Sequence, residues 1–511
     1  MKRYERVGFC FALSILLFLS PRLSASQLHI IYSTYSPDYL GLLNGEDWKE
    51  KTLNYLSKLW SQIKDDPEPS LLLSLGEEGA PGVEKGNPKQ KIIEIARGCE
   101  ELGIDFFIQV AGPTPPLLTP PTCEEVFKCA PKHCKGIYLS EPFNSGFGWK
   151  YLNDLISFRN LCKKYHRKMV WAEHSRDGTQ GMGWWGFSMV NVEGWSKLFS
   201  KEYADVIVPL HETNDPRVET LNMATCLGMW LGGLAREWGF SVQDWWWNDA
   251  GYGPIDTCPA DVIFRSCLES ASLGATYLEF EHMQMIWEWG TWSLARIYKE
   301  GIKPFLELYK KGKIRIPQKE EILSFSRLAI KLLKQGNDIA LLDSCPWEKQ
   351  TPEHYIPNYF YEEKDFREGL IPKTPYGILV LFPTNVTPPK GKFHYVLDCD
   401  GAQTHYEGKP YSPSETKSLI LSLVERKPLP LKVYDAYGVL TRIGKREYLL
   451  WIINSREKEP GKTNVSFRLS LGFKKYLLYD RESGKLIGEG KENEKIQVEV
   501  EDYRLIEVRG R

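Results

Sequence analysis

The sequence predicts an α/β fold, a (β/α)8 TIM barrel followed by a small C-terminal antiparallel β-sandwich domain. Three observations predict it. Short apolar segments alternate with polar loops and amphipathic helical segments from residue 28 to about residue 290. Eight such segments fall in that stretch, which is the number and spacing that a (β/α)8 barrel requires. From about residue 431, apolar and polar residues alternate as they do in half-buried antiparallel strands.

The eight segments are apolar on both faces, which is typical of parallel strands covered by helices. The predicted strands are 28–33, 70–75, 106–110, 136–140, 168–172, 205–210, 245–248 and 275–281. The predicted helices are 48–63, 91–102, 151–165, 259–273, 292–309 and 319–334. An open doubly wound sheet is the alternative, but no glycine-rich phosphate-binding motif follows the first strand. The barrel is therefore favoured.

A change in composition after the barrel suggests further domains. Prolines are frequent from Pro352 to Pro389, where we expect an irregular connecting region with a strand at 377–382 and a helix at 414–425. The strands expected after it are 447–453, 464–469, 475–479, 496–500 and 503–508. The predicted division is a signal peptide at 1–26, a catalytic barrel at 27–335, a mixed connecting region at 336–430 and a β-sandwich at 431–511. Packing and sugar binding are both open as roles for the last domain.

The N-terminus has the pattern of a secretory signal peptide. A positively charged start is followed by an apolar run from Val7 to Leu19, and Ser24 and Ser26 give small residues before a cleavage site near residue 26. The run is short for a membrane span, although an uncleaved anchor is an alternative. We therefore expect a secreted or extracytoplasmic monomer with no stable membrane insertion after cleavage.

Charge and cysteine content narrow the function further. The net charge is −1 with acidic and basic residues interspersed, which argues against nucleic acid as a partner. Of the 11 cysteines, all but Cys10 follow the predicted cleavage site, and an exported protein is expected to pair some of them in disulfide bonds. A zinc site involving the neighbouring Cys123, Cys129 and Cys134 is the weaker alternative, because no Cys-x-x-Cys pair accompanies them. No cofactor is predicted.

Acidic residues gather at the carboxyl ends of the predicted strands, where barrel enzymes have their active sites. Glu141 ends the fourth strand, Asp249 follows the seventh, and Glu279 and Glu281 close the eighth. The ends of the fifth and sixth strands carry Glu173, His174, His211 and Glu212. Any one of these could be a solvated loop residue or the partner of an arginine. Several like charges together are costly unless they have a task.

Glycoside hydrolysis needs such a cluster, because one carboxyl must donate a proton and another must be ionised. We therefore take Glu141, Asp249 and Glu281 as the catalytic candidates, with Glu141 as the acid. Strands four and seven face each other across a barrel mouth. Glu279 and Glu281 share one face of their strand, and Glu281 is the better candidate since it lies nearer the mouth.

Aromatic residues fall in the same loops. The chain has 17 Trp and 26 Tyr, and an indole face can stack on the apolar face of a pyranose ring. A packing role is equally open for any single tryptophan. The predicted substrate-binding residues are Glu173, His174, Trp184, Trp185, His211, Glu212, Trp247, Tyr252, Glu279 and Trp287. The expected partner is an oligosaccharide or polysaccharide.

Two other chemistries fit parts of this pattern. His174, His211 and His282 with their neighbouring glutamates could ligate a divalent metal ion in a barrel hydrolase. The first strand, however, has no His-x-His at its end, as a metal-dependent amidohydrolase barrel would have, so no metal ligands are predicted. A non-catalytic carbohydrate-binding barrel would keep the tryptophans without needing an acid and a base.

Several motifs resemble glycoside hydrolase family 98. They are Cys226–Leu234, Trp238-Gly239, Asp244–Tyr252 and Gly274–Glu281. The resemblance implies a catalytic barrel with a C-terminal β domain, and a secreted inverting endo-β-glycosidase acting on blood-group-type galactosides or xylan. It also implies a glutamic acid as proton donor, with an aspartate and a glutamate assisting the attacking water, which correspond to Glu141, Asp249 and Glu281.

Ser140-Glu141-Pro142 also resembles the Asn-Glu-Pro motif of retaining barrel glycosidases. Ser140 replaces the asparagine of that motif, and the seventh strand offers Asp249 rather than a glutamate. Both departures favour inversion, and a retaining clan-A-like glycosidase is the alternative. A carboxyl separation of about 5–5.5 Å would indicate retention and one of about 6.5–9.5 Å inversion.

Overall fold

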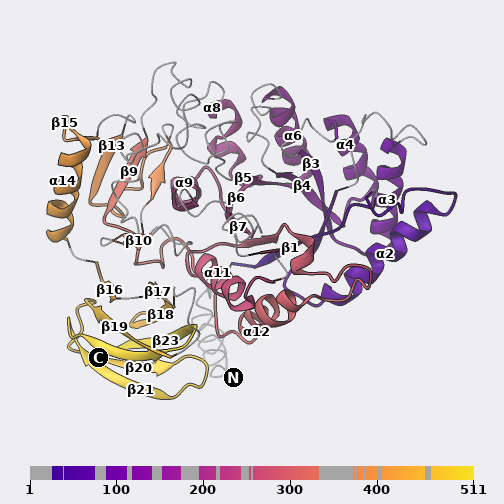
Figure 1. The fold of residues 1–511 in the computed structure, drawn as a ribbon. Helices are drawn as coiled ribbons and strands as arrows, with labels where there is room; N and C mark the ends of the chain where they lie inside the picture. The colour runs from indigo at the N-terminus through magenta and orange to yellow at the C-terminus, as the bar shows by residue number, and fades with distance from the viewer. Residues whose placement is uncertain are drawn as a thin grey trace, which may run out of the picture.

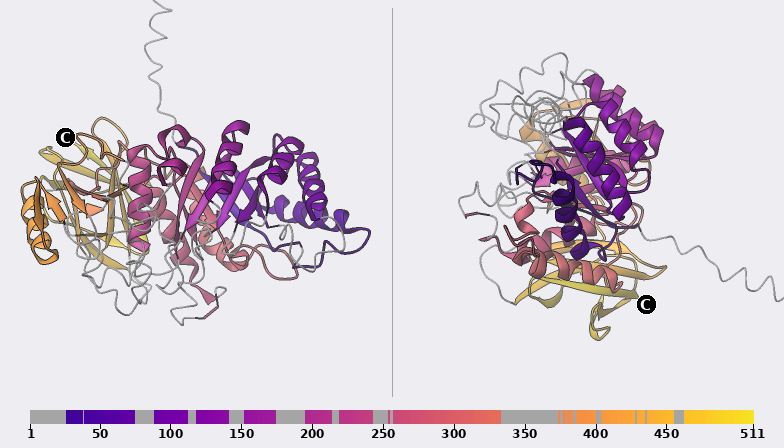
Figure 2. Two further views of the ribbon diagram at one scale, coloured as in Figure 1. Left: turned by 90° about the horizontal axis from the view of Figure 1, so that it is seen from above. Right: turned by 90° about the vertical axis from the view of Figure 1, so that its right-hand side faces the viewer.

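The structure is a computed structural model that describes seventeen stretches of the chain. These are residues 26–37, 39–74, 88–111, 118–140, 152–173, 195–213, 219–242, 253–254, 257–332, 373–374, 377–378, 380–383, 386–399, 404–427, 429–434, 436–454 and 462–511. Three bodies of secondary structure follow one another along the chain (Figure 1). They are a closed barrel, a five-stranded middle sheet with one helix, and a pair of C-terminal sheets. Helices α2 and α3 lie at the opposite end of the molecule from α14 (Figures 1 and 2).

The first eight strands form a closed parallel barrel in sequence order, which confirms the predicted fold. The circle closes between the first and last strands, where Tyr32 pairs with Phe280 in parallel register. The strands are β1 (His29–Ser33), β2 (Pro69–Leu73), β3 (Phe106–Ala111), β4 (Cys134–Ser140), β5 (Lys168–Glu173), β6 (Ile207–Thr213), β7 (Gly239–Val242) and β8 (Tyr277–Phe280).

Helices connect the barrel strands and cover them. Their burial follows the helical period: in α2 the buried side chains include Thr52, Leu56, Leu59 and Ile63, which lie on one face. The helices are α2 (Trp48–Ile63), α3 (Pro88–Leu102), α4 (Pro120–Cys129), α6 (Leu152–Tyr165), α8 (Trp195–Leu198), α9 (Glu219–Gly232), α11 (Ala260–Ser272) and α12 (Lys303–Lys310). Short helical turns lie at Lys201–Tyr203, Met283–Met285 and Tyr298–Ile302.

The seventh strand is not where the sequence suggested. It is β7, Gly239–Val242, rather than 245–248, and residues 243–250 lie outside the described part. The prediction followed the high β-propensity of Trp245–Trp247, whereas β7 is a four-residue segment that begins with glycine. A larger residue would not fit at position 239, because an added Cβ would lie 2.4 Å from the carbonyl oxygen of Tyr277 on β8.

Two predicted helices after the barrel are also wrong in part. Within 319–334 the structure has strand β9 (Leu328–Leu332), which pairs in parallel with β12 and β13. Tertiary pairing therefore overrides the helical pattern of this segment. The helix expected at 292–309 begins later, as a π-helical turn at Tyr298 that continues into α12.

Nine of the described side chains form a hydrophobic cluster in the barrel interior, and the helices cover the outside. The interior cluster is Ile31, Leu72, Phe107, Tyr138, Val170, Ala172, Val208, Leu210 and Tyr277. Alternate residues of each strand, such as Trp171 and Ile207, belong instead to the larger core shared with the helices. Because side chains alternate along a strand, a residue two positions from a member of the interior cluster also points into the barrel, and its immediate neighbour points outward.

The middle sheet packs against the barrel through α9. It has the strand order β12-β9-β13-β14-β15, with α14 (Pro413–Glu425) beside it. Gly228 of α9 allows the contact, because a Cβ there would lie 1.7 Å from the carbonyl oxygen of Leu381 on β12. Ser412 and Glu415 form a capping box that begins α14. The remaining elements are β10 (Lys373–Thr374), β11 (Gly377–Ile378), β12 (Leu381–Phe382), β13 (Tyr395–Cys399), β14 (Thr404–Tyr406) and β15 (Lys409–Tyr411).

The C-terminal strands form two antiparallel sheets around their own core, drawn in yellow in Figure 1. The strand orders are β16-β19-β22 and β17-β18-β23-β20-β21. Arg265 of α11 donates a 2.7 Å hydrogen bond to the carbonyl oxygen of Asn454, which ties this region to the barrel. The strands are β16 (Leu431–Tyr434), β17 (Tyr437–Arg442), β18 (Glu447–Ile453), β19 (Thr463–Leu469), β20 (Lys475–Asp480), β21 (Leu486–Lys491), β22 (Ile496–Val500) and β23 (Tyr503–Gly510).

The cysteines of the described part carry free thiols rather than disulfide bonds. They are Cys99, Cys123, Cys129, Cys134, Cys162, Cys226, Cys258 and Cys267. All except Cys129 are buried, and burial raises the pKa of Cys134 to about 12. The disulfide prediction is therefore not met by these eight, since they serve as apolar core residues. The side chains of Cys345 and Cys399 lie outside the description. No helix of the described residues is long and apolar enough to cross a membrane.

Candidate active site

A buried carboxylate occupies the barrel interior just below the carboxyl ends of the strands. Glu279 of β8 is completely buried and accepts hydrogen bonds from three hydroxyls on three other strands. Ser33 Oγ of β1 donates at 2.9 Å, Tyr138 OH of β4 at 3.1 Å, and Ser241 Oγ of β7 at 2.5 Å. Burial raises the pKa of Glu279 to about 7, while the three hydrogen bonds act in the opposite direction.

Tyr138 connects this carboxylate to two others. Its ring is buried in the barrel interior, and burial raises the pKa of its hydroxyl. The next largest contributions to that rise are the negative charges of Glu279, Glu281 and Glu212, in that order. Three carboxylates from β6 and the end of β8 therefore lie within electrostatic range of one hydroxyl from β4.

Glu281 is the accessible member of this group. It follows β8, and its backbone N–H continues the strand pairing by donating to the carbonyl oxygen of Val242 at 3.2 Å. Its side chain is half-buried, whereas those of Glu212 and Glu279 are completely buried. Ser140 Oγ, at the end of β4, lies 3.5 Å from Glu281 Oε1. The expected order, with Glu281 nearer the mouth than Glu279, agrees with this arrangement.

His211 does not face the barrel mouth. Val208 and Leu210 belong to the interior cluster, so strand alternation directs Glu212 inward and His211 outward. The imidazole is completely buried, packs against Phe240 with ring centroids 5.5 Å apart, and has no hydrogen-bond partner among the residues that the structure describes. Burial lowers its pKa to about 3. The structure therefore gives His211 a packing role in place of the predicted sugar contact.

Trp287 also takes a packing position. Its side chain is 1% exposed, and its indole N–H donates a 3.0 Å hydrogen bond to the carbonyl oxygen of Ser33. An indole so enclosed offers no open face for stacking on a sugar. Packing, which the sequence left open for any single tryptophan, is the role that applies here.

The remaining predicted site residues lie outside the described side chains. These are Glu141, Glu173, His174, Trp184, Trp185, Trp247, Asp249 and Tyr252. Of Glu173 only the backbone is described, and it ends β5 in register with His211. The roles assigned to these eight residues stay predictions.

The hydroxyl groups around Glu279 are functional groups that no sequence pattern had indicated. Ser33, Tyr138 and Ser241 come from strands far apart in the chain, so no local motif unites them. Tyr138 did carry a usable signal, because it lies two residues before Ser140 and three before Glu141. A polar residue at an inward position of a barrel strand points into the same interior as the catalytic candidates.

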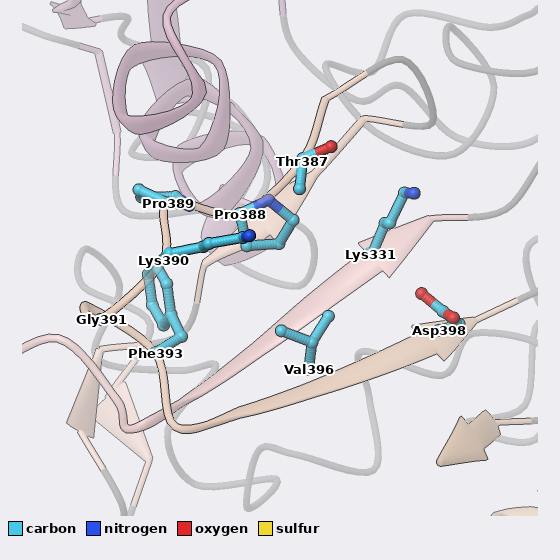
Figure 3. Close-up of a pocket in the computed structure, with 9 residues that line it drawn as sticks. All are labelled: Lys331, Thr387, Pro388, Pro389, Lys390, Gly391, Phe393, Val396 and Asp398. Atoms are coloured by element: carbon cyan, nitrogen blue, oxygen red, sulfur yellow. The ribbon is translucent and has the colours of Figure 1, made fainter. Parts of the chain in front are cut away.

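A cavity of about 420 Å³ lies on the middle sheet rather than at the barrel strand ends (Figure 3). Pro388, Pro389, Phe393 and Val396 give it apolar walls. Lys331 of β9 and Asp398 of β13 are register partners, and both line the cavity. Among the described residues, no group of three or more His, Cys, Asp and Glu is arranged to hold a metal ion.

Part of the chain matches a known protein family. Residues 178–342 match the family model described as "Lambda-carrageenase middle domain", and this range contains Glu212, Asp249, Glu279 and Glu281. λ-Carrageenases from Pseudoalteromonas sp and from Pseudoalteromonas carrageenovora are each 24% identical over 239 residues. The match covers 40% of this chain but only 23% of each relative's length.

Solved structures have a similar fold over most of the chain. The catalytic module of a family 98 glycoside hydrolase from Streptococcus pneumoniae TIGR4, in complex with the LewisY pentasaccharide blood group antigen, superposes with a TM-score of 0.61 at 17% identity. That alignment covers 88% of this chain and 75% of the other. The same module with the H-disaccharide blood group antigen gives a TM-score of 0.61, 18% identity, and 88% and 76% coverage. The fold expected from the resemblance to family 98 is thereby confirmed.

Proposed function

We propose that this chain is an exported glycoside hydrolase that cleaves within a galactose-containing polysaccharide or glycan. The observation that carries the proposal is the position of Glu281, which is half-buried at the carboxyl end of β8, above the buried Glu279. Its Oε1 atom lies 3.5 Å from the hydroxyl of Ser140, which ends β4 and immediately precedes Glu141. Glu281 thus supplies one described carboxylate at the carboxyl ends of the strands, and Glu141 is proposed as the second acidic residue that the chemistry needs.

In the proposed reaction, the carboxylic acid of Glu141 gives its proton to the glycosidic oxygen as the bond to the anomeric carbon breaks. Glu281, together with Asp249, accepts a proton from the water that attacks the anomeric carbon from the opposite face. The result is inversion at that carbon. Glu279 acts one layer below as a positioning residue, since its contact with Tyr138 fixes the hydroxyl that neighbours Glu281.

The comparisons support a galactose-containing substrate. The curated relatives are λ-carrageenases, and the family 98 modules were solved with blood group oligosaccharides. We therefore place λ-carrageenan and blood-group-type galactosides first among test substrates, and keep xylan as the alternative. Export is supported by the signal-like pattern before residue 27.

Glu141→Gln tests the proposal. We expect turnover of the best substrate to fall by about 10³-fold or more, because the amide cannot donate the proton, while oligosaccharide binding persists. Glu300→Gln is the matched control, since Glu300 is an exposed carboxylate on the π-helical turn at Tyr298–Ile302. Full activity of the Glu141 variant would refute its role as the acid.

The product anomer distinguishes the two hydrolytic routes. Proton NMR recorded in the first minutes of hydrolysis should show the anomer opposite to the cleaved linkage if the reaction inverts. The same anomer would support the retaining alternative. Binding of the glycans with no release of reducing ends by the parent protein would support the non-catalytic barrel instead.

A further inference from the structure

Four aromatic side chains form a continuous cluster on the loops that follow β1 and β8. We name this cluster the aromatic wall; it consists of Tyr35, Tyr39, Trp289 and Trp292. Ring centroids lie 4.8 Å apart for Tyr35 and Trp289, 5.4 Å for Tyr35 and Trp292, and 5.4 Å for Trp289 and Trp292. Tyr39 joins at 6.0 Å from Trp289. Since these loops follow the carboxyl ends of neighbouring strands, the wall stands on the face of the barrel where its active site belongs.

Two members of the wall are open to solvent. Tyr39 is 76% exposed and Trp289 is 57% exposed. Six large apolar side chains in the described part of the chain are exposed, and the other four are aliphatic and less exposed than these two: Leu102, Val396, Leu421 and Leu486. The two exposed aromatic residues are therefore next to each other rather than scattered. A contiguous exposed patch of this kind marks a binding surface more often than isolated apolar residues do.

Backbone hydrogen bonds within the loop that carries Trp289 stabilise its conformation. Trp287 and Leu294 form an isolated antiparallel bridge, and the N–H of Glu288 donates to the carbonyl oxygen of Ser293 at 2.9 Å. The N–H of Trp292 donates to the carbonyl oxygen of Glu288, also at 2.9 Å. Binding at Trp289 would thus require little ordering of the loop, which favours affinity.

Trp292 has a backbone conformation that is unusual for a bulky residue, with φ at +56°. Two contacts from α2 stabilise it. Gln62 Nε2 donates to the carbonyl oxygen of Trp292 at 2.8 Å, and the ring of Tyr55 meets its indole edge-on at 5.3 Å. Strain retained at a surface loop is commonly associated with a functional role. Here it holds Trp292 behind Trp289.

Two hydrogen bonds connect the loop that carries Trp289 and Trp292 to the buried carboxylate. Trp287, two residues before Trp289, donates from its indole N–H to the carbonyl oxygen of Ser33 at 3.0 Å. Ser33 Oγ in turn donates to Glu279 at 2.9 Å. Ser33 therefore has two roles: it ends β1, the strand that leads into Tyr35, and it donates a hydrogen bond to the buried carboxylate of the candidate site.

We propose that the aromatic wall is a sugar-binding subsite, in which Trp289 and Tyr39 contact the apolar face of a pyranose ring of the glycan chain. This inference rests on the proposed function, because it takes the same glycan as the ligand. The exposed rings of Tyr39 and Trp289 are inclined at 66° to each other, and each offers an apolar face on which the C–H face of a pyranose can stack. The wall's four members are uncharged, so they would recognise the ring face rather than a charged substituent.

The test is a binding measurement in the Glu141→Gln background, which removes turnover from the readout. Trp289→Ala and Tyr39→Ala are added singly and together, and the dissociation constant is measured by calorimetry with λ-carrageenan oligosaccharides and with blood-group-type oligosaccharides. Leu486→Ala is the matched control, because Leu486 is 56% exposed on β21 of the C-terminal sheets. Both wall positions are exposed, so these variants should fold, and circular dichroism checks this.

We expect Trp289→Ala to weaken binding of the bound oligosaccharide by about tenfold and the double variant by more, while Leu486→Ala changes nothing. In the parent background, kcat/KM for the polysaccharide should fall in parallel. Unchanged affinity in the folded double variant would overturn the subsite and leave the proposed function standing. If the Glu141→Gln protein bound none of the glycans and the parent protein cleaved none, the subsite and the proposed function would both fall.

Discussion

The hydroxyl of Tyr138, on β4, donates a 3.1 Å hydrogen bond to the carboxylate of Glu279, on β8, across the interior of the barrel. The two residues are 141 positions apart in the chain. Their contact couples the strand that precedes the predicted acid Glu141 to the strand that leads to Glu281. Both groups are completely buried, and Glu279 also accepts hydrogen bonds from Ser33 and Ser241, so the hydroxyls around it satisfy a carboxylate that water does not reach.

Tyr138→Phe should destabilise the protein more at pH 8 than at pH 5. The pKa of Glu279 is about 7, so the lost hydrogen bond involves a neutral acid at pH 5 and a carboxylate at pH 8. We expect a loss of about 1 kcal/mol at pH 5 and about 2–3 kcal/mol at pH 8, measured by chemical denaturation.

Tyr165→Phe is the control for that experiment. Tyr165 donates to Glu124 at 2.8 Å near the surface, and Lys164, followed by Tyr165, lowers the pKa of Glu124 to about 2. Glu124 is thus ionised at both pH values, and the effect of Tyr165→Phe should not differ between them. An equal effect of Tyr138→Phe at pH 5 and pH 8 would contradict the titration assigned to Glu279.

His211→Phe should make the protein less sensitive to acid. The folded protein keeps this imidazole neutral down to a pKa of about 3, whereas in the unfolded chain it titrates near its ordinary value of 6.5. Its contribution to stability is therefore present above pH 6.5 and is lost as the pH falls toward 3. Between pH 7 and pH 4 the variant should lose about 2–3 kcal/mol less stability than the parent. Identical acid unfolding curves would show that the imidazole is accessible to protons.

Glu281→Gln should reduce kcat by about 10²–10⁴-fold, as expected for loss of a catalytic base. Ser140→Ala removes the hydroxyl 3.5 Å from Glu281 Oε1 and should reduce kcat/KM by about fivefold, while Ser140→Thr, which keeps a hydroxyl, should recover most of it. The measurement is initial-rate kinetics on the substrate that the glycan screen identifies. A threonine variant as weak as the alanine variant would argue that volume, not the hydroxyl, matters at position 140.

Gly228→Ala should destabilise the contact between the barrel and the middle sheet. The added Cβ would lie 1.7 Å from the carbonyl oxygen of Leu381, so α9 and β12 would have to separate. We expect a loss of about 2–3 kcal/mol in thermal or chemical unfolding. Gly488→Ala is the matched control, since the nearest side-chain atom to its Cβ, on Leu478, is 3.9 Å away. Comparable stability of the two variants would mean that the contact between α9 and β12 is not tightly packed.

The sequence was most informative where burial and periodicity coincide. Seven of the eight barrel strands lie where two-sided apolar segments predicted them, because such strands are specified by their own composition. The exception is β7, which has only four residues and begins with glycine, so its sequence carries a weak strand signal. Its position is fixed by its pairing with β6 and β8. Likewise, the sequence around β9 has the pattern of a helix, and the segment forms a strand because it pairs with β12 and β13.

The site was predictable to the level of strand ends and no further. That Glu279 and Glu281 share a face followed from alternation, and the same rule applied to Val208, Leu210 and Glu212 would have excluded His211. The hydroxyls of Ser33, Tyr138 and Ser241 could not be assigned to Glu279, because their convergence depends on the register of four strands around the barrel. The burial of Trp287 could not be predicted either, because its indole N–H is satisfied by the backbone carbonyl of Ser33, a residue far away in the chain.

The close approach of α9 to β12 also bears on how such proteins can be divided and recombined. Gly228 lies 16 residues after Glu212 in the chain. The helix that follows β6, α9, is therefore covered by β12, a strand of the middle sheet. A barrel expressed alone would expose to water the part of α9 around Gly228 that β12 covers in the whole protein. Exchange of catalytic barrels between relatives should therefore succeed only when the middle sheet is carried along, making the two a single inherited unit.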